Sequence, residues 1–258
     1  MANGLECGPP LPVEAVSFSS EHDVPELVAC IRSFLAQAGV PTALTVISDG
    51  SYTRASAQLL EAIHPCVAVV DWREVARPEL PSVLWEYART NWRGKKLLVL
   101  VSLGVERPLV YTDADVLFFT GATDLHRLAA NAAGPRYLRD CAGRMFLDRS
   151  MLAEEREADE SINAGFMLLT EPLDWEPALR RLERRLRWKP TTFTGQTVVH
   201  LTLHAAGAQR LDPARYVVAD DDRARLDDPH VGPATALRHY VDPVRHKFWT
   251  ALAGSGLT

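Results

Sequence analysis

Two aspartates, Asp113 and Asp115, are separated by one residue in the segment LVYTDADVLFFT, which covers residues 109–120. Aspartate is uncommon inside β-strands, so its presence between two apolar runs needs a reason. Residues two apart on an extended chain point the same way, so we expect both carboxylates to share one face. Carboxylate oxygens suit Mg²⁺ or Mn²⁺, and such an ion would remove the repulsion between them. The pair predicts a divalent-metal site; the alternative is a turn in which both side chains cap backbone amides.

The elements that would position this pair alternate between strand-like and helix-like segments. The strand-like segments are 13–20, 43–50, 66–72 and 109–119, and the helix-like segments are 24–35, 53–63, 83–89 and 95–103. This order predicts an α/β fold with a mostly parallel central sheet flanked by helices. Such sheets bind ligands beyond the carboxyl ends of their strands, where Ser19, Ser20 and Asp49 would join the two aspartates.

The composition of the chain excludes several classes of protein. The 258 residues are 47% hydrophobic and carry a net charge of −5, so no basic surface is expected to bind nucleic acid. The start of the sequence lacks the pattern of a signal peptide, and the apolar run at 97–105 is too short to span a membrane. The four cysteines form no CxxC pair, which fits free thiols, and we expect a cytoplasmic protein.

The sequence resembles a known family at several separate segments. PLVYTDADVLFF resembles the DxD segment of GT-A glycosyltransferases, and SINAGFMLLT resembles the NAG strand of the same enzymes. The helix start FTGQTVVH and the late segment RHYVDPVRHKFW complete the order seen in glycosyltransferase family 8, the group of glycogenin and bacterial lipopolysaccharide galactosyltransferases. The resemblance runs from Val13 to Trp249.

This resemblance implies a fold and an activity. The fold would be GT-A, the Rossmann-like fold of nucleotide-diphospho-sugar transferases, in one domain over 1–258. Residues 13–120 would form its nucleotide-binding half, and residues 121–258 its acceptor and sugar half. The activity would be a metal-dependent transfer of a sugar from a nucleoside diphosphate, with UDP-hexose favoured, to an unidentified acceptor, with retention of configuration. The sequence gives no indication of an oligomeric state.

The resemblance also assigns roles to individual residues. Asp113, Asp115 and His239 would hold Mn²⁺ or Mg²⁺, while Gln196 and Asn163 would stand in the catalytic positions, with Gln196 facing the reacting carbon. The other expected contacts with the donor nucleotide and sugar are Ser19, Ser20, Asp49, Lys95, Ala114, Ala164, Gly165 and Lys247. Gly165 would let the backbone approach the ligand closely.

Two assignments leave a choice between neighbouring residues. Either Lys95 or Lys96 could contact the donor sugar or its phosphates. The late segment departs from the family pattern HxxGxxKPW, because Asp242 replaces the glycine, Arg245 stands at the place of the lysine, and Lys247 follows two residues later. Either Arg245 or Lys247 could therefore contact a phosphate.

Other functions fit parts of the same sequence. DADVLFF also matches the first motif of haloacid-dehalogenase-like phosphatases, with Asp113 as nucleophile, Asp115 as acid and base, and 220–222 as later metal-binding acids. That motif normally opens its domain, whereas here two strand–helix units precede it. A sugar-nucleotide pyrophosphorylase would need a Gly-rich basic loop after the first strand, and SFSSEHDVPE has none. A non-catalytic domain that binds nucleotide sugars is the remaining alternative.

Overall fold

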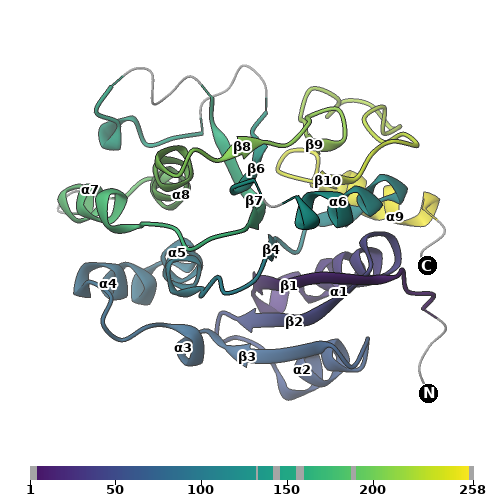
Figure 1. The fold of residues 1–258 in the computed structure, drawn as a ribbon, viewed down its shortest axis with the longest axis horizontal. Coiled ribbons are helices and arrows are strands. Elements are labelled where there is room, and N and C mark those ends of the chain that lie inside the picture. Colours follow the sequence, from purple (N-terminus) through teal and green to yellow (C-terminus); the bar gives the residue numbers. More distant parts are fainter. Residues whose placement is uncertain (1–4, 132, 142–145, 155–159, 187–189, 256–258) are drawn as a thin grey trace.

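The chain folds around a seven-stranded sheet with helices on both faces (Figure 1). The structure is a computed structural model that describes residues 5–131, 133–141, 146–154, 160–186 and 190–255. The strands lie in the order β3-β2-β1-β4-β7-β6-β8. Their bounds are β1 (Pro10–Ser19), β2 (Val40–Ser48), β3 (Val67–Asp71), β4 (Leu109–Thr112), β6 (Arg136–Arg139), β7 (Ile162–Leu169) and β8 (Gln209–Arg210). Only β7 runs against its neighbours in this sheet, so the expected mostly parallel α/β sheet is confirmed.

The helices form two groups, one on each face of the sheet. Their bounds are α1 (Val24–Ser33), α2 (Arg54–Glu61), α3 (Trp72–Val75), α4 (Ser82–Thr90), α5 (Trp92–Ser102), α6 (Asp124–Ala130), α7 (Glu176–Leu186), α8 (Thr194–Ala205) and α9 (Phe248–Gly254). Figure 1 shows α4, α5, α7 and α8 on one side and α1, α6 and α9 on the other. Successive side chains of β4 point to opposite faces of the sheet. Leu109 and Tyr111 therefore join the core under α5, while Val110 joins the core under α1. None of the helices described has both the length and the apolar content that a membrane span requires.

A second, smaller sheet carries the late part of the chain to the two aspartates. It consists of β5 (Val116–Phe118), β10 (Leu237–His239) and β9 (Tyr216–Val218), and its register places His239 opposite Val116. The segment LVYTDADVLFF is divided between two strands, and the two aspartates follow the carboxyl end of the first strand, as the sequence predicted. β4 ends at Thr112 in the main sheet and β5 begins at Val116 in the small sheet. Asp113 and Asp115 lie in the turn between the two strands, so strand alternation does not explain how they are oriented.

A break between α4 and α5 positions the lysines that precede the turn. The Asn91 side chain accepts a hydrogen bond from Arg93 N (2.9 Å) and so caps the start of α5. Gly94 allows the two helices to meet closely, because a Cβ at this position would lie 2.5 Å from the carbonyl oxygen of Tyr87. The first turns of α5 lie at the carboxyl edge of the main sheet, where Lys95 reaches Asp49 O and Lys96 reaches Asp113.

Candidate functional site

Asp113, Asp115 and His239 come together beyond the carboxyl end of β4. One ligand atom of each lies within 4.8 Å of the others. Backbone hydrogen bonds fix the turn on both sides, since Asp113 N donates to Gly165 O (2.8 Å) and Tyr240 N donates to Asp115 O (2.9 Å). Two carboxylates and an imidazole are a donor set that Mn²⁺ and Mg²⁺ accept, so these residues fit a divalent ion.

Asp113 is held by a lysine and a tyrosine. Lys96 Nζ lies 2.7 Å from each carboxylate oxygen, and the Tyr111 hydroxyl donates to Oδ1 at 2.7 Å. Burial, together with the adjacent carboxylate of Asp113, raises the pKa of Tyr111 well above its ordinary value, so this hydroxyl keeps its proton. The carboxylate of Asp113 therefore has a fixed position before any ligand binds.

Asp115 and His239 form a hydrogen-bonded pair. His239 Nε2 lies 3.0 Å from Asp115 Oδ1, and Arg245 Nη1 lies 3.8 Å from Asp115 Oδ2. Burial raises the pKa of Asp115, but His239, Arg245 and Lys96 outweigh it and keep that pKa below the ordinary value. Burial lowers the pKa of His239, but Asp115 outweighs it and raises the pKa. A divalent ion bound here would itself supply positive charge beside Asp115, in addition to that of the neighbouring basic side chains.

Asn163 lies behind His239 and orients it. Its Oδ1 is 2.8 Å from His239 Nδ1 and also accepts a hydrogen bond from Gly165 N at 2.8 Å. Because an amide oxygen only accepts, His239 Nδ1 carries a hydrogen and Nε2 is directed at Asp115. Hydrogen bonds of this kind fix the ring orientation of metal-binding histidines. The resemblance placed Asn163 in a catalytic position. In the structure, this residue also positions His239 through a hydrogen bond.

Gly165 provides the space that His239 occupies. A Cβ on Gly165 would lie 2.2 Å from Cε1 and 2.3 Å from Nδ1 of His239. The strand is irregular here, since the partners of β6 in β7 jump from Met167 to Asn163. Such bulges re-aim side chains next to functional sites. The close neighbour of Gly165 is therefore an imidazole of the chain itself, whereas the sequence suggested a ligand.

Gly165→Ala should weaken metal binding, because the added methyl group displaces His239 and breaks its contact with Asn163. We expect the affinity for Mn²⁺, measured by titration, to fall by about 10- to 100-fold. Gly104→Ala is the matched control, since a Cβ there meets nothing within 4 Å. An unchanged Mn²⁺ titration for Gly165→Ala would show that His239 is not needed at the metal site.

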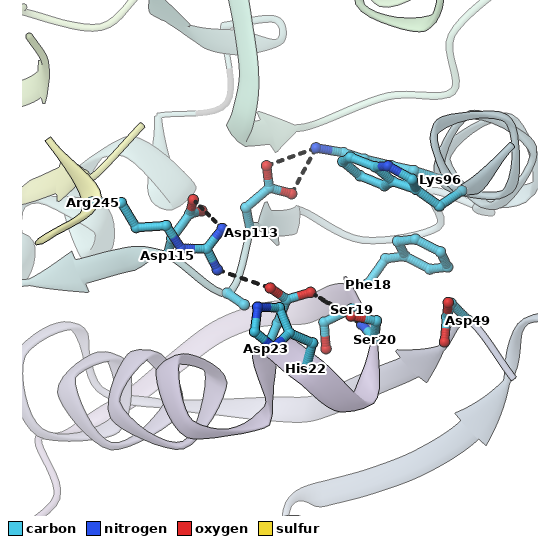
Figure 2. Close-up of a pocket in the computed structure, with 12 residues that line it drawn as sticks. Phe18, Ser19, Ser20, His22, Asp23, Asp49, Lys96, Asp113, Asp115 and Arg245 are labelled. Atoms are coloured by element: carbon cyan, nitrogen blue, oxygen red, sulfur yellow. Dashed lines mark hydrogen bonds and ion pairs between the residues drawn. The ribbon is translucent and has the colours of Figure 1, made fainter. Parts of the chain in front are cut away.

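Two adjoining cavities open around these residues. The larger, of about 430 Å³, is lined by the expected residues Ser19, Ser20, Asp49 and Ala114 together with both aspartates. The smaller, of about 200 Å³, is lined by the expected residues Asn163, Ala164, Gly165, Gln196 and His239. The two cavities share Trp92, Lys96 and Asp113. Figure 2 shows the larger cavity, with Asp49 at the opposite end from Asp115 and Arg245.

The structure separates the two lysines at the start of α5. Lys96 lines both cavities and binds Asp113, whereas Lys95 Nζ donates to Asp49 O at 2.8 Å and lies 5.7 Å from the Trp72 ring. Successive helical residues are rotated by about 100°, so only one of two neighbours can reach the same carboxylate. Of the two lysines that the sequence left as alternatives, Lys96 is the one that lines the cavities, and Lys95 does not.

The late segment separates its basic residues in the same way. Arg245 lines the larger cavity, and its Nη2 lies 2.8 Å from Asp23 Oδ1 (Figure 2). Lys247 is buried elsewhere, with Nζ 2.6 Å from Asp222 Oδ2 and 2.7 Å from Asp227 O. Lys247 was expected to contact the donor, but its ammonium group is held in this separate ion cluster. We therefore replace Lys247 with Arg245.

The same ion cluster bears on the phosphatase alternative. That alternative needs one of the acids 220–222 beside Asp113 and Asp115. Asp222 instead accepts hydrogen bonds from Arg238 (2.9 Å) and Lys247 (2.6 Å) in a buried position. The described contacts of Asp222 therefore belong to a structural cluster, and this acid does not join Asp113 and Asp115 as the phosphatase arrangement would require.

Asp140 is a site residue that the sequence reasoning missed. Its Oδ2 accepts a hydrogen bond from Gln196 Nε2 (2.8 Å), and its Oδ1 accepts one from Asn163 Nδ2 (3.3 Å). Burial raises the pKa of Asp140 against the opposing effect of these hydrogen bonds. The sequence feature that could have indicated Asp140 is its position directly after the short segment RYLR. This segment forms β6, which ends at the same edge of the sheet as β4.

The amide of Gln196 has a defined orientation as a result. Its Nε2 donates to Asp140 Oδ2 and to Phe146 O (3.1 Å), so both amide hydrogens are used. Among the residues that the structure describes, none donates to the amide oxygen, which is left for a ligand in the smaller cavity that Gln196 lines. The side chain thus presents a lone pair to that cavity.

Comparisons with known proteins find similarity in structure only. No protein-family profile and no curated protein sequence matches this chain. Among solved structures, the chain is similar to the galactosyltransferase LgtC in complex with donor and acceptor sugar analogues, with a TM-score of 0.58 and 13% identity. The alignment covers 94% of this chain and 96% of that one.

Two further structures agree with this result. Mouse xyloside xylosyltransferase 1 aligns with a TM-score of 0.57 and 12% identity, over 91% of this chain and 99% of that one. The bifunctional glycosyltransferase WbbM aligns with a TM-score of 0.58 and 14% identity, over 95% of this chain and 50% of that one. At this level of identity the similarity shows the fold, and the expected GT-A fold is confirmed.

Proposed function

We propose that this chain, which has the GT-A fold, is a metal-dependent glycosyltransferase. It transfers a hexose from a nucleoside diphosphate, with UDP favoured, to the hydroxyl of a separate acceptor, with retention of configuration. The observation that carries the proposal is the meeting of Asp113, Asp115 and His239 within 4.8 Å, at the border of the two cavities. The similarity of the fold to a galactosyltransferase and a xylosyltransferase supports it.

The larger cavity suits the nucleoside diphosphate. Ser19, Ser20 and Asp49 would contact the nucleoside, while Lys96 and Arg245 would pair with the diphosphate at the other end. A Mn²⁺ or Mg²⁺ ion held by Asp113, Asp115 and His239 would supply positive charge where the diphosphate leaves. Lys96 and Arg245 add fixed positive charge at the same place, which stabilises a departing anion.

The smaller cavity suits the reacting sugar. During transfer, the bond between the anomeric carbon of the donor and its phosphate oxygen breaks, and a bond between that carbon and the acceptor oxygen forms. The proton of the acceptor hydroxyl goes to the departing diphosphate, so atoms and charges balance. Ala164 and Gly165 would border the sugar, and Gln196 Oε1 would face its reacting carbon while Asp140 holds the amide in place.

A thermal-shift screen against nucleotides tests this proposal. We expect UDP and UDP-hexoses with Mn²⁺ to raise the melting temperature by several degrees, and to do so less without Mn²⁺, because binding to the native state stabilises it. ADP and GDP in parallel wells identify the base. Failure of every nucleoside diphosphate to stabilise the protein would contradict the proposal, and release of phosphate from p-nitrophenyl phosphate without a nucleotide would favour a phosphatase.

A further inference from the structure

Trp92 is an exposed aromatic side chain at the junction of the two cavities. It is the first residue of α5, it lines both cavities, and 54% of it is exposed to solvent. The other exposed large hydrophobic residues of the described chain line neither cavity; they are Leu59, Leu226 and Trp249. An indole ring offers a large apolar face at a position that a ligand must pass.

Arg93 lies against Trp92 and, in the part of the chain that the structure describes, is the arginine or lysine of the two cavities that has no carboxylate partner. Its guanidinium carbon is 4.4 Å from the centroid of the Trp92 ring, and its side chain lines the smaller cavity. The other cations of the two cavities are paired, Lys96 with Asp113 and Arg245 with Asp23. Within the described ranges, no carboxylate lies within ion-pair distance of Arg93. The smaller cavity therefore has a positive charge available for a ligand.

The position of the pair points to the acceptor. The residues proposed to hold the nucleoside, Ser19 and Asp49, line only the larger cavity. The acceptor hydroxyl must approach the same carbon that Gln196 faces, and Gln196 lines only the smaller cavity. The exposure of Trp92 puts the pair at the solvent side of this cavity, the side that stays open to an acceptor once the donor sugar is bound.

We propose that Trp92 and Arg93 form the acceptor site and select a sugar with an anionic substituent. This inference rests on the proposed glycosyltransferase function. The sugar ring packs its C–H groups against the indole of Trp92 beside Arg93, since the ring face carries partial negative charge. The guanidinium of Arg93 pairs with the acidic group of the acceptor, and its fork of N–H donors matches a carboxylate.

Matched pairs of small sugars test this inference on the full chain with UDP and Mn²⁺ present. The probes are methyl glycopyranosides and the corresponding methyl uronides of the gluco, galacto and manno series, with binding followed by ligand-detected NMR titration. In at least one pair we expect the uronide to bind about tenfold more tightly than its neutral counterpart. Trp92→Ala should weaken binding of both members by about tenfold or more, and Arg93→Gln should remove the preference for the uronide.

Trp249→Ala is the matched control, because this exposed indole lies in α9 away from both cavities and its loss should leave sugar binding unchanged. The inference is overturned if no probe binds, if uronide and neutral sugar bind equally, or if Trp92→Ala weakens UDP binding as much as sugar binding. Binding of UDP and Mn²⁺ by the wild-type chain is measured in the same samples. If UDP binds and the sugars do not, only this inference fails, whereas loss of both removes the proposed function as well.

Discussion

Asparagine in place of Asp113 or Asp115 should abolish Mn²⁺-dependent donor turnover, with a loss of at least about 10³-fold. Asparagine keeps the shape of the side chain but removes the negative charge that a divalent ion requires. Asp113 also fixes Lys96, so Asp113→Asn should release the lysine from its position as well. Hydrolysis of UDP-hexose at several Mn²⁺ concentrations, together with the thermal shift produced by UDP and Mn²⁺, measures both effects.

Asp227→Asn provides the control for a change of charge alone. Asp227 forms an exposed ion pair with Arg225, so its substitution should leave metal dependence unchanged. Loss of activity in Asp113→Asn would not by itself separate a transferase from a phosphatase, because both reactions use this residue. The thermal shift separates them, since only the transferase requires the metal for nucleotide binding. Wild-type metal dependence in both asparagine variants would refute the metal assignment.

The edge at which the site forms could be predicted because each strand leaves a local pattern. Apolar runs ending in polar residues marked the carboxyl ends of β1, β2 and β4, and parallel strands bring those ends together. The larger cavity accordingly contains Ser19, Asp49 and Asp113. Strand alternation was the wrong reason for the orientation of the aspartates, since the chain leaves the main sheet at Thr112 and starts the small sheet at Val116.

Contacts between segments distant in sequence could not be predicted in the same way. Asp140 follows a strand of four residues with little apolar character, and its importance appears only when Gln196, 56 residues later, is placed beside it. Lys95 and Lys96 are equivalent in the sequence and differ only in the direction that α5 gives them. The need for glycine at position 165 also comes from a tertiary contact, because the neighbouring His239 lies 74 residues later in the chain, on β10.

The buried ion cluster that holds Lys247 also explains how β10 is held. Arg238 precedes His239 on β10, has no exposed side-chain surface, and contacts the carboxylates of Asp222 and Asp228. Lys247 completes the cluster on Asp222. These bonds tie the acidic loop and the late segment to the strand that carries His239. The cluster therefore supports the proposed metal site without contributing to its chemistry.

Arg238→Met should destabilise the protein by about 3 kcal/mol, because its removal leaves Asp228 without its cation and Asp222 with Lys247 alone. Urea unfolding followed by circular dichroism measures this change. Arg225→Met is the matched control, since Arg225 pairs with Asp227 on the same loop but both side chains are exposed. Exposed ion pairs contribute little, so the control should lie within about 0.5 kcal/mol of the wild type.

The pH dependence of unfolding provides an independent check on the same cluster. Burial raises the pKa of Asp222, but hydrogen bonds and charges from Arg238 and Lys247 outweigh it and lower the pKa to about 2. The folded pKa lies below the unfolded value of about 3.9, so this stabilisation is present above pH 4 and is lost as the pH falls toward 2. In Arg238→Met the pKa of Asp222 should move back toward its ordinary value, and the free energy of unfolding should fall less steeply between pH 4 and pH 2. A variant that unfolds in urea and in acid like the wild type would show that the cluster does not stabilise the fold.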